Sequence, residues 1–154
     1  MINEYTGWSG RIRVTTTHKD GSQTVEEFGN LITSAGRNLL RNALDGGVTD
    51  LKIKYMGWGN GTTAPSAGDV KLINEVGREP ITKQTRGATG VQTSTTYLPF
   101  FKANEQIEEL GWFAGSTASG TADTGVLVAR VLYSKLKTDA ESLQVDRVDT
   151  IGGV

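Results

Sequence analysis

The stretch RIRVTTT at residues 11–17 alternates apolar and polar side chains, the pattern of a β-strand with one buried face. Residues 18–22 (HKDGS) have the composition of a turn, and residues 23–28 (QTVEEF) predict a second strand that completes a hairpin. Glycine is frequent, with 20 of 154 residues, whereas proline is scarce, with 3. This composition favours strands joined by glycine turns over a helical bundle, so the protein is predicted to be mainly β.

One helix is predicted outside this hairpin, near residues 34–44. Thr33 or Ser34 can act as its N-cap, its leucines recur at helical spacing, and residues 45–47 (DGG) end it. Further strands are predicted at residues 51–56, 78–85, 91–101, 106–114, 126–134 and 143–151, with a long loop of small residues at 57–69. Short strands with regular turn signals, one early helix and no βαβ alternation predict an antiparallel β-sandwich that is jelly-roll-like.

Residues 11–154 are interpreted as a single sandwich domain and residues 1–10 as an N-terminal arm. A neighbouring subunit would order this arm, because it is polar apart from three large side chains. Burial within its own domain is the alternative.

The run VLVARVLY at residues 126–133 is apolar at both alternating sets of positions. Such a strand is either covered on both sides within the domain or faces another subunit, and we favour burial within the domain. The last strand changes its apolar phase between Val145 and Val148, which suits a bulge or a side that leaves the core.

Charge and cysteine content exclude several classes of protein. The 16 basic residues nearly balance the 17 acidic ones and are scattered, so nucleic acid is not an expected partner. With no cysteine, disulfides and thiolate metal sites are excluded. Neither a signal peptide nor a membrane-spanning apolar run is recognisable, so we expect neither secretion by a signal pathway nor membrane insertion.

No catalytic residues, cofactor or metal ligands are predicted. The only histidine, His18, falls in an apparent turn, where an exposed polar residue is the expected role. Neighbouring carboxylates such as Glu108 and Glu109, or Asp146 and Asp149, face opposite sides of a regular strand, so we interpret them as solvated surface charge. Asp123 could at most contribute to a weak cation site built from several segments.

The segment GWGNG at residues 57–61 has some likeness to a phosphate-binding loop, but no Gly-Lys-Ser/Thr follows and no helix is predicted after it. We interpret it as a strand that ends in a bulge or tight turn. There glycine would supply a positive φ, and Trp58 would pack against a neighbour.

Large aromatic side chains provide the candidate interface or surface contacts, since tryptophan often anchors interfaces and stacks on sugars. These candidates are Tyr5, Trp8, Trp58 and Trp112. The alternative for the three tryptophans is that they fill the core.

An ordered set of segments resembles a family of small phage and prophage structural proteins, labelled tail, tail-fibre or virion proteins. The segments are residues 28–40 (FGNLITSAGRNLL), 55–65 (YMGWGNGTTAP), 74–78 (NEVGR), 107–113 (IEELGWF) and 128–131 (VARV). The resemblance covers about residues 28–134.

This resemblance implies a component of the virion that is made in the host cytoplasm and has no enzyme activity. Its expected partners are copies of itself, as a homotrimer, and other capsid or tail proteins. The chain has no coiled-coil or repetitive shaft, which leaves a tail or baseplate component and a capsid decoration protein as the two expected roles. A tail module that binds a host receptor or carbohydrate is the alternative function.

Overall fold

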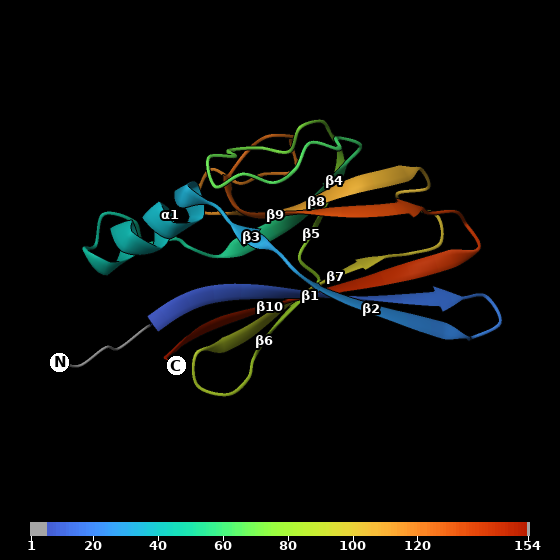
Figure 1. The fold of residues 1–154 in the computed structure, drawn as a ribbon, viewed down its shortest axis with the longest axis horizontal. Coiled ribbons are helices and arrows are strands. Elements are labelled where there is room, and N and C mark those ends of the chain that lie inside the picture. The colour runs from blue at the N-terminus through green and yellow to red at the C-terminus, as the bar shows by residue number, and fades with distance from the viewer. Residues whose placement is uncertain (1–5, 154) are drawn as a thin grey trace.

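The computed structural model describes residues 6–153, which form two antiparallel five-stranded sheets that pack face to face (Figure 1). Sheet A has the strand order β2-β1-β10-β7-β6, and sheet B has the order β3-β9-β8-β4-β5. The elements are β1 (Thr6–His18), β2 (Gln23–Gly29), β3 (Leu31–Ile32), α1 (Ser34–Leu44), β4 (Ile53–Gly59), β5 (Glu75–Pro80), β6 (Lys83–Arg86), β7 (Val91–Leu98), β8 (Gln106–Ala114), β9 (Val126–Leu136) and β10 (Glu141–Gly153). The predicted antiparallel β-sandwich with one short helix is confirmed.

Hairpins of consecutive strands stay within one sheet, namely β1–β2, β4–β5, β6–β7 and β8–β9. Between them the chain crosses to the other sheet, after β2, β5, β7 and β9. The longest pairing joins β1 to β10, from Thr6↔Gly153 to His18↔Glu141 without a register shift. Residues 6–10 of the expected N-terminal arm therefore belong to β1 and pair with this chain's own β10, while residues 1–5 lie outside the described residues.

The main core lies between the two sheets. Sheet A contributes Ile12, Val14, Leu143 and Val145, and sheet B contributes residues such as Trp112, all of which are almost fully buried. Their positions alternate along each strand with residues on the outer face, as the period of a half-buried strand requires.

Helix α1 begins where the sequence indicates. Thr33 is the N-cap, and its Oγ1 accepts a hydrogen bond from the backbone N of Gly36 at 2.9 Å. The same hydroxyl donates to the carbonyl of Leu127, which fixes the helix to β9. Gly36 packs directly against the Val128 backbone, and a Cβ at this position would collide with it. These contacts attach α1 to one end of the sandwich (Figure 1).

Most of both faces of sheet B is covered within the chain, apart from the exposed outer side of β9 at residues 132–136. On the face opposite sheet A, two long loops at residues 60–74 and 115–125 lie over β4, β8 and β9 (Figure 1). A second small core forms beneath them from Leu72, Phe113 and Leu127, with Tyr55 and Ala118 packed against it. The prediction that the apolar run 126–133 is buried within its own domain is therefore confirmed for residues 127–131 and for Tyr133, whereas Leu132 is 40% exposed.

The structure differs from the predicted strands in three places. Residues 78–85 form parts of two strands, β5 in sheet B and β6 in sheet A, because the chain crosses between the sheets near Ile81. The short strand β3 was not predicted. For the last strand, the alternative of a bulge is wrong, because its pairing with β1 has no register shift. The other alternative, a side that leaves the core, fits: Arg147 and Asp149 continue the inward-facing row of Leu143 and Val145, and Val148 lies on the opposite, less buried side.

One long side of the sandwich is closed by Tyr133 of β9, whose ring stacks on Phe28 with a centroid distance of 5.5 Å. The Tyr133 hydroxyl donates to Glu26 Oε1 at 3.4 Å. Burial, followed by the negative charge of Glu26, raises the pKa of the Tyr133 phenol above its ordinary value of 10.0.

The raised pKa of Tyr133 predicts a loss of stability in alkali. Above pH 10 the unfolded chain releases the phenolic proton whereas the folded protein retains it, so the free energy of unfolding should fall by up to about 1.4 kcal/mol per pH unit from this group. Urea unfolding between pH 9 and pH 11 should show a shallower fall for Tyr133→Phe than for the wild type. Tyr97→Phe, which removes an exposed phenol from β7, is the control and should keep the wild-type slope. Equal slopes for the wild type and Tyr133→Phe would contradict the assignment.

Candidate functional site

A buried ion pair on the outer face of sheet B holds the loop at residues 60–74. Glu109 of β8 and Arg130 of β9 have fully buried side chains, and Arg130 Nε lies 2.7 Å from Glu109 Oε2. The two side chains also hold the loop directly. Arg130 donates to the Thr63 carbonyl at 2.7 Å and to Asp69 Oδ2 at 3.1 Å.

The carboxylate of Glu109 is saturated by backbone donors. It accepts hydrogen bonds from the N–H groups of Gly61, Ile73 and Asn74 at 3.1, 3.1 and 2.9 Å. Both ends of the loop thus converge on one side chain, which also has Arg130 as its counter-ion. The prediction that Glu109 is a solvated surface charge is wrong.

The glycines of the GWGNG segment permit this arrangement. None of the three glycines has a positive φ. The prediction that glycine is needed at 57, 59 and 61 for its backbone conformation is therefore wrong. Their importance is steric. A Cβ at Gly59 would collide with the Asn74 carbonyl, and one at Gly61 would collide with Ile73. The expected bulge is present where β4 pairs with β5, between Trp58 and Gly59.

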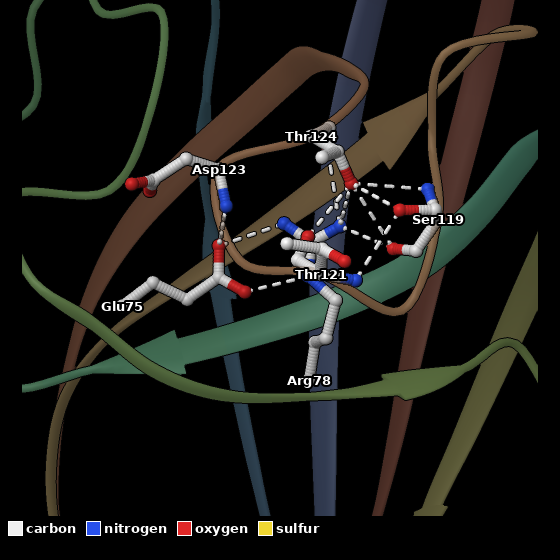
Figure 2. A network of polar contacts seen from close by, with 6 residues as sticks. All are labelled: Glu75, Arg78, Ser119, Thr121, Asp123 and Thr124. Atoms are coloured by element: carbon white, nitrogen blue, oxygen red, sulfur yellow. Dashed lines mark hydrogen bonds and ion pairs between the residues drawn. The ribbon is translucent and has the colours of Figure 1, made fainter.

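A second ion pair holds the loop at residues 115–125 (Figure 2). Arg78 of β5 forms two hydrogen bonds to Glu75, at 2.6 and 2.7 Å, and its guanidinium lies 4.2 Å from the centre of the Phe113 ring. Its Nη1 donates to the carbonyls of Ser119 and Thr124 at 2.8 and 3.1 Å. Figure 2 shows the guanidinium extending into the turn of this loop, with Glu75 beside it.

Glu75 completes the attachment by accepting a hydrogen bond from the backbone N of Asp123 at 3.1 Å. Asp123 has a positive φ of 64°, a conformation that aspartate tolerates better than most residues. The backbone of Asp123 therefore helps to form the turn of this loop, whereas its side chain is exposed.

Replacement of Arg78 by lysine should release the loop at 115–125, because a single ammonium cannot reproduce the two parallel bonds to Glu75 and the contacts to two carbonyls. We expect amide hydrogen exchange in residues 115–125 to rise at least about tenfold, with a loss of stability of roughly 1–3 kcal/mol. Arg13→Lys, an exposed change on β1, is the control and should leave exchange in this loop unchanged. Unchanged exchange in Arg78→Lys would show that the arginine does not hold the loop.

A third buried ion pair lies at the inner face of sheet A. Arg147 and Asp149 of β10 form two hydrogen bonds, at 3.0 and 2.6 Å, and the indole Nε1 of Trp8 donates to Asp149 Oδ1 at 2.8 Å. The Arg147 guanidinium lies 5.3 Å from the Trp112 ring. Asp149 is therefore a buried partner of Arg147, and its interpretation as surface charge is wrong.

Trp8 lines a cavity with a volume of about 540 Å³, which lies between the sheets beside α1. Its walls are mixed, with polar or charged side chains, Lys52 and Thr85 among them, beside the apolar ones. The lining residues include Trp8, Leu39, Ile53, Val128, Asp149 and Ile151, with Gln84, Arg86 and Gln92 as further polar groups. Concave sites of this size that combine apolar walls with polar groups are the usual form of a small-ligand site.

The other predicted aromatic contacts do not gather at this cavity. Trp58 and Trp112 are only 4% and 0% exposed and belong to the main core, so their prediction as surface contacts is corrected. The Trp58 indole donates to Glu105 Oε1 at 2.8 Å. Tyr5 lies outside the described residues. Trp8 is half-buried and reaches the cavity, so it remains the aromatic candidate for contact with a ligand.

His18 ends β1, next to the turn in which it was predicted. Its side chain is 39% exposed, and Nδ1 lies 3.8 Å from Glu141 Oε2.

Lys137 donates hydrogen bonds to the Pro99 carbonyl at 3.0 Å and to Asn104 Oδ1 at 2.9 Å. Burial lowers the pKa of Lys137. These contacts join the loops at this end of the sandwich.

Within residues 6–153, no three His, Cys, Asp or Glu side chains are placed to hold a metal ion together. The same part of the chain has no helix with the length and apolar character needed to span a membrane. Comparison of the chain with protein-family models, with curated proteins and with solved structures gives no match.

Proposed function

We propose that this chain is a non-enzymatic structural protein of a bacteriophage particle. It is a β-sandwich module that assembles with copies of itself and with other virion proteins, as a tail or baseplate component or as a capsid decoration protein. The ordered set of segments that resembles small phage structural proteins supports this assignment. Three is the number of copies that the resemblance implies.

The immobilised loops of sheet B are the structural observation that carries the proposal. Loops that bind or catalyse commonly carry functional side chains and move on binding. Here four buried side chains form two ion pairs, Glu75 with Arg78 and Glu109 with Arg130. Both pairs also bind the loop backbone. The result is a surface of fixed shape, which suits a module that repeats the same contacts many times in a particle.

Purified phage particles from cells that encode the chain provide the test. Mass spectrometry should detect the chain at a constant ratio to the major capsid protein, and immunogold labelling should locate it on the tail or on the capsid. For a decoration protein, added chain should also bind particles that lack it and raise their melting temperature. Particles of full infectivity that contain none of the chain would overturn the proposal.

The cavity beside α1 favours a second candidate function, a module that binds a carbohydrate of the host surface. Trp8 lines the cavity with its indole N–H bound to Asp149, and Gln84, Gln92 and Arg86 are planar polar side chains of the kind that bind sugar hydroxyl groups. A glycan array should then give a signal with the wild type that is lost in Trp8→Ala. Equal signals, or no signal from either protein, would reject this candidate.

A further inference from the structure

One edge of sheet B is only partly covered by a neighbouring strand. β3 pairs with β9 at just two positions, Leu31↔Arg130 and Ile32↔Ala129. From Val131 to Leu136, β9 pairs with β8 on one side, and no strand of the described residues pairs with it on the other. The backbone groups of alternate residues in this stretch are therefore open to another strand.

Other sheet edges carry features that discourage pairing. β2 has Glu26 and Glu27, β6 is four residues long with Lys83 and Arg86, and β5 ends at Pro80. Charged residues, short strands and proline are the usual protection of exposed sheet edges. The open stretch of β9 has no proline and no charged side chain on its outer face, and its one irregularity is the register shift in its pairing with β8, opposite Ile107 and Glu109.

The outer face of this stretch consists of Leu132, Ser134 and Leu136. The leucines are 40% and 63% exposed, and Ser134 between them is exposed as well. The one charged residue of the stretch, Lys135, extends toward sheet A, where its Nζ lies 3.6 Å from Glu141 Oε1. A shallow groove lined by Phe28, Leu31, Pro65 and Leu132 adjoins the edge.

We propose that a second copy of this chain pairs its β9 edge with this one, antiparallel and about a two-fold axis at Ser134. The sequence of the edge is self-complementary in this register. Leu132 faces Leu136 of the second copy, Ser134 faces Ser134 of the second copy, and the two B sheets join into one. Cross-strand apolar pairs of this kind stabilise antiparallel strands, whereas the β2 edge of another copy would place glutamates near the leucines.

The inference rests on the self-assembly in the proposed function and names the surface through which two copies meet. A pairing of about five residues per strand buries less surface than the roughly 1,200 Å² that stable protein complexes bury. The dimer should accordingly be weak, with a Kd on the order of 10 µM to 1 mM. A trimer would need a further contact of a different, head-to-tail type.

Sedimentation equilibrium of the whole chain up to about 1 mM tests the surface. The wild type should dimerise, and Leu132→Lys or Leu136→Lys should raise the Kd at least about tenfold, because lysines would face leucines across the new pair. Leu44→Lys, at an 84% exposed position on α1, is the matched control and should dimerise like the wild type. A wild type that stays monomeric, or leucine variants that dimerise normally, would overturn the proposal.

A cysteine on the axis tests the register. The chain has no cysteine, so Ser134→Cys carries a single thiol, and its Cα would lie about 5.5 Å from its copy in a hydrogen-bonded pair, within disulfide range. Under mild oxidation it should form covalent dimers at least about tenfold faster than Ser22→Cys, an exposed thiol in the β1–β2 turn. Equal rates would reject this register.

Particle content separates the two proposals. A chain that is present in purified particles but fails both dimer tests would remove only the β9 pairing. A chain that dimerises through β9 but is missing from fully infective particles would remove only the phage assignment.

Discussion

Replacement of Arg130 by methionine should lower the free energy of unfolding by about 3–5 kcal/mol, the usual cost of removing one partner of a buried ion pair. The change leaves the buried carboxylate of Glu109 without its counter-ion. It also removes the donors to the Thr63 carbonyl and to Asp69. Methionine keeps most of the side-chain volume, so the loss would report on charge and hydrogen bonding more than on a cavity.

Urea unfolding at neutral pH measures this loss. Arg11→Met is the matched control, because Arg11 forms a 3.5 Å ion pair with Glu27 on the surface, where both side chains are about half exposed or more. Surface pairs of this kind contribute about 0–1 kcal/mol, so the control should change stability little. A loss below about 1 kcal/mol for Arg130→Met would show that the buried pair does not hold the loop to the sheet.

Replacement of Gly59 by alanine should cost about 2–3 kcal/mol, as overpacking of a dense site does. The added methyl group would collide with the Asn74 carbonyl and would lie 2.6 Å from Glu109 Oε1. To make room, the loop at residues 60–74 must move away from Glu109, which weakens its hydrogen bonds to Gly61 and Asn74.

Gly29→Ala is the control for Gly59→Ala, since a Cβ at Gly29 meets no atom within 4 Å and the position also lies in a strand. The control should be neutral or more stable by up to about 1 kcal/mol, because alanine restricts the unfolded chain. Equal stability of the two variants would contradict the close-approach role of Gly59. Hydrogen exchange of the Ile73 and Asn74 amides should rise in Gly59→Ala alone.

Much of the fold was predictable because it depends on local patterns. The alternation in residues 11–17 and the glycine turn after them predicted the first hairpin, and Thr33 with residues 45–47 predicted both ends of α1. The double apolar pattern of residues 126–133 predicted a strand covered on both faces. These features depend on side-chain period and capping, which neighbouring residues determine.

The buried ion pairs were missed although the sequence contained a signal. Arg130 is the one charged residue in the apolar run 126–133, and a charge within a strand covered on both faces needs a buried partner. The partner could not be identified, since Glu109 lies 21 residues away and the bulge between Ile107 and Glu109 sets the face on which its side chain lies.

The sequence by itself determined the β class, the helix and most strand positions, because alternation, glycine turns and helix caps act over a few residues. Tertiary structure alone decided that residues 78–85 divide between two sheets, that the glycines at 57–61 give space to a loop, and that Glu109, Arg130, Arg147 and Asp149 are buried. It also decided which edge of β9 stays open. Each of these depends on contacts between residues far apart in the chain, whose register and spacing no local pattern specifies.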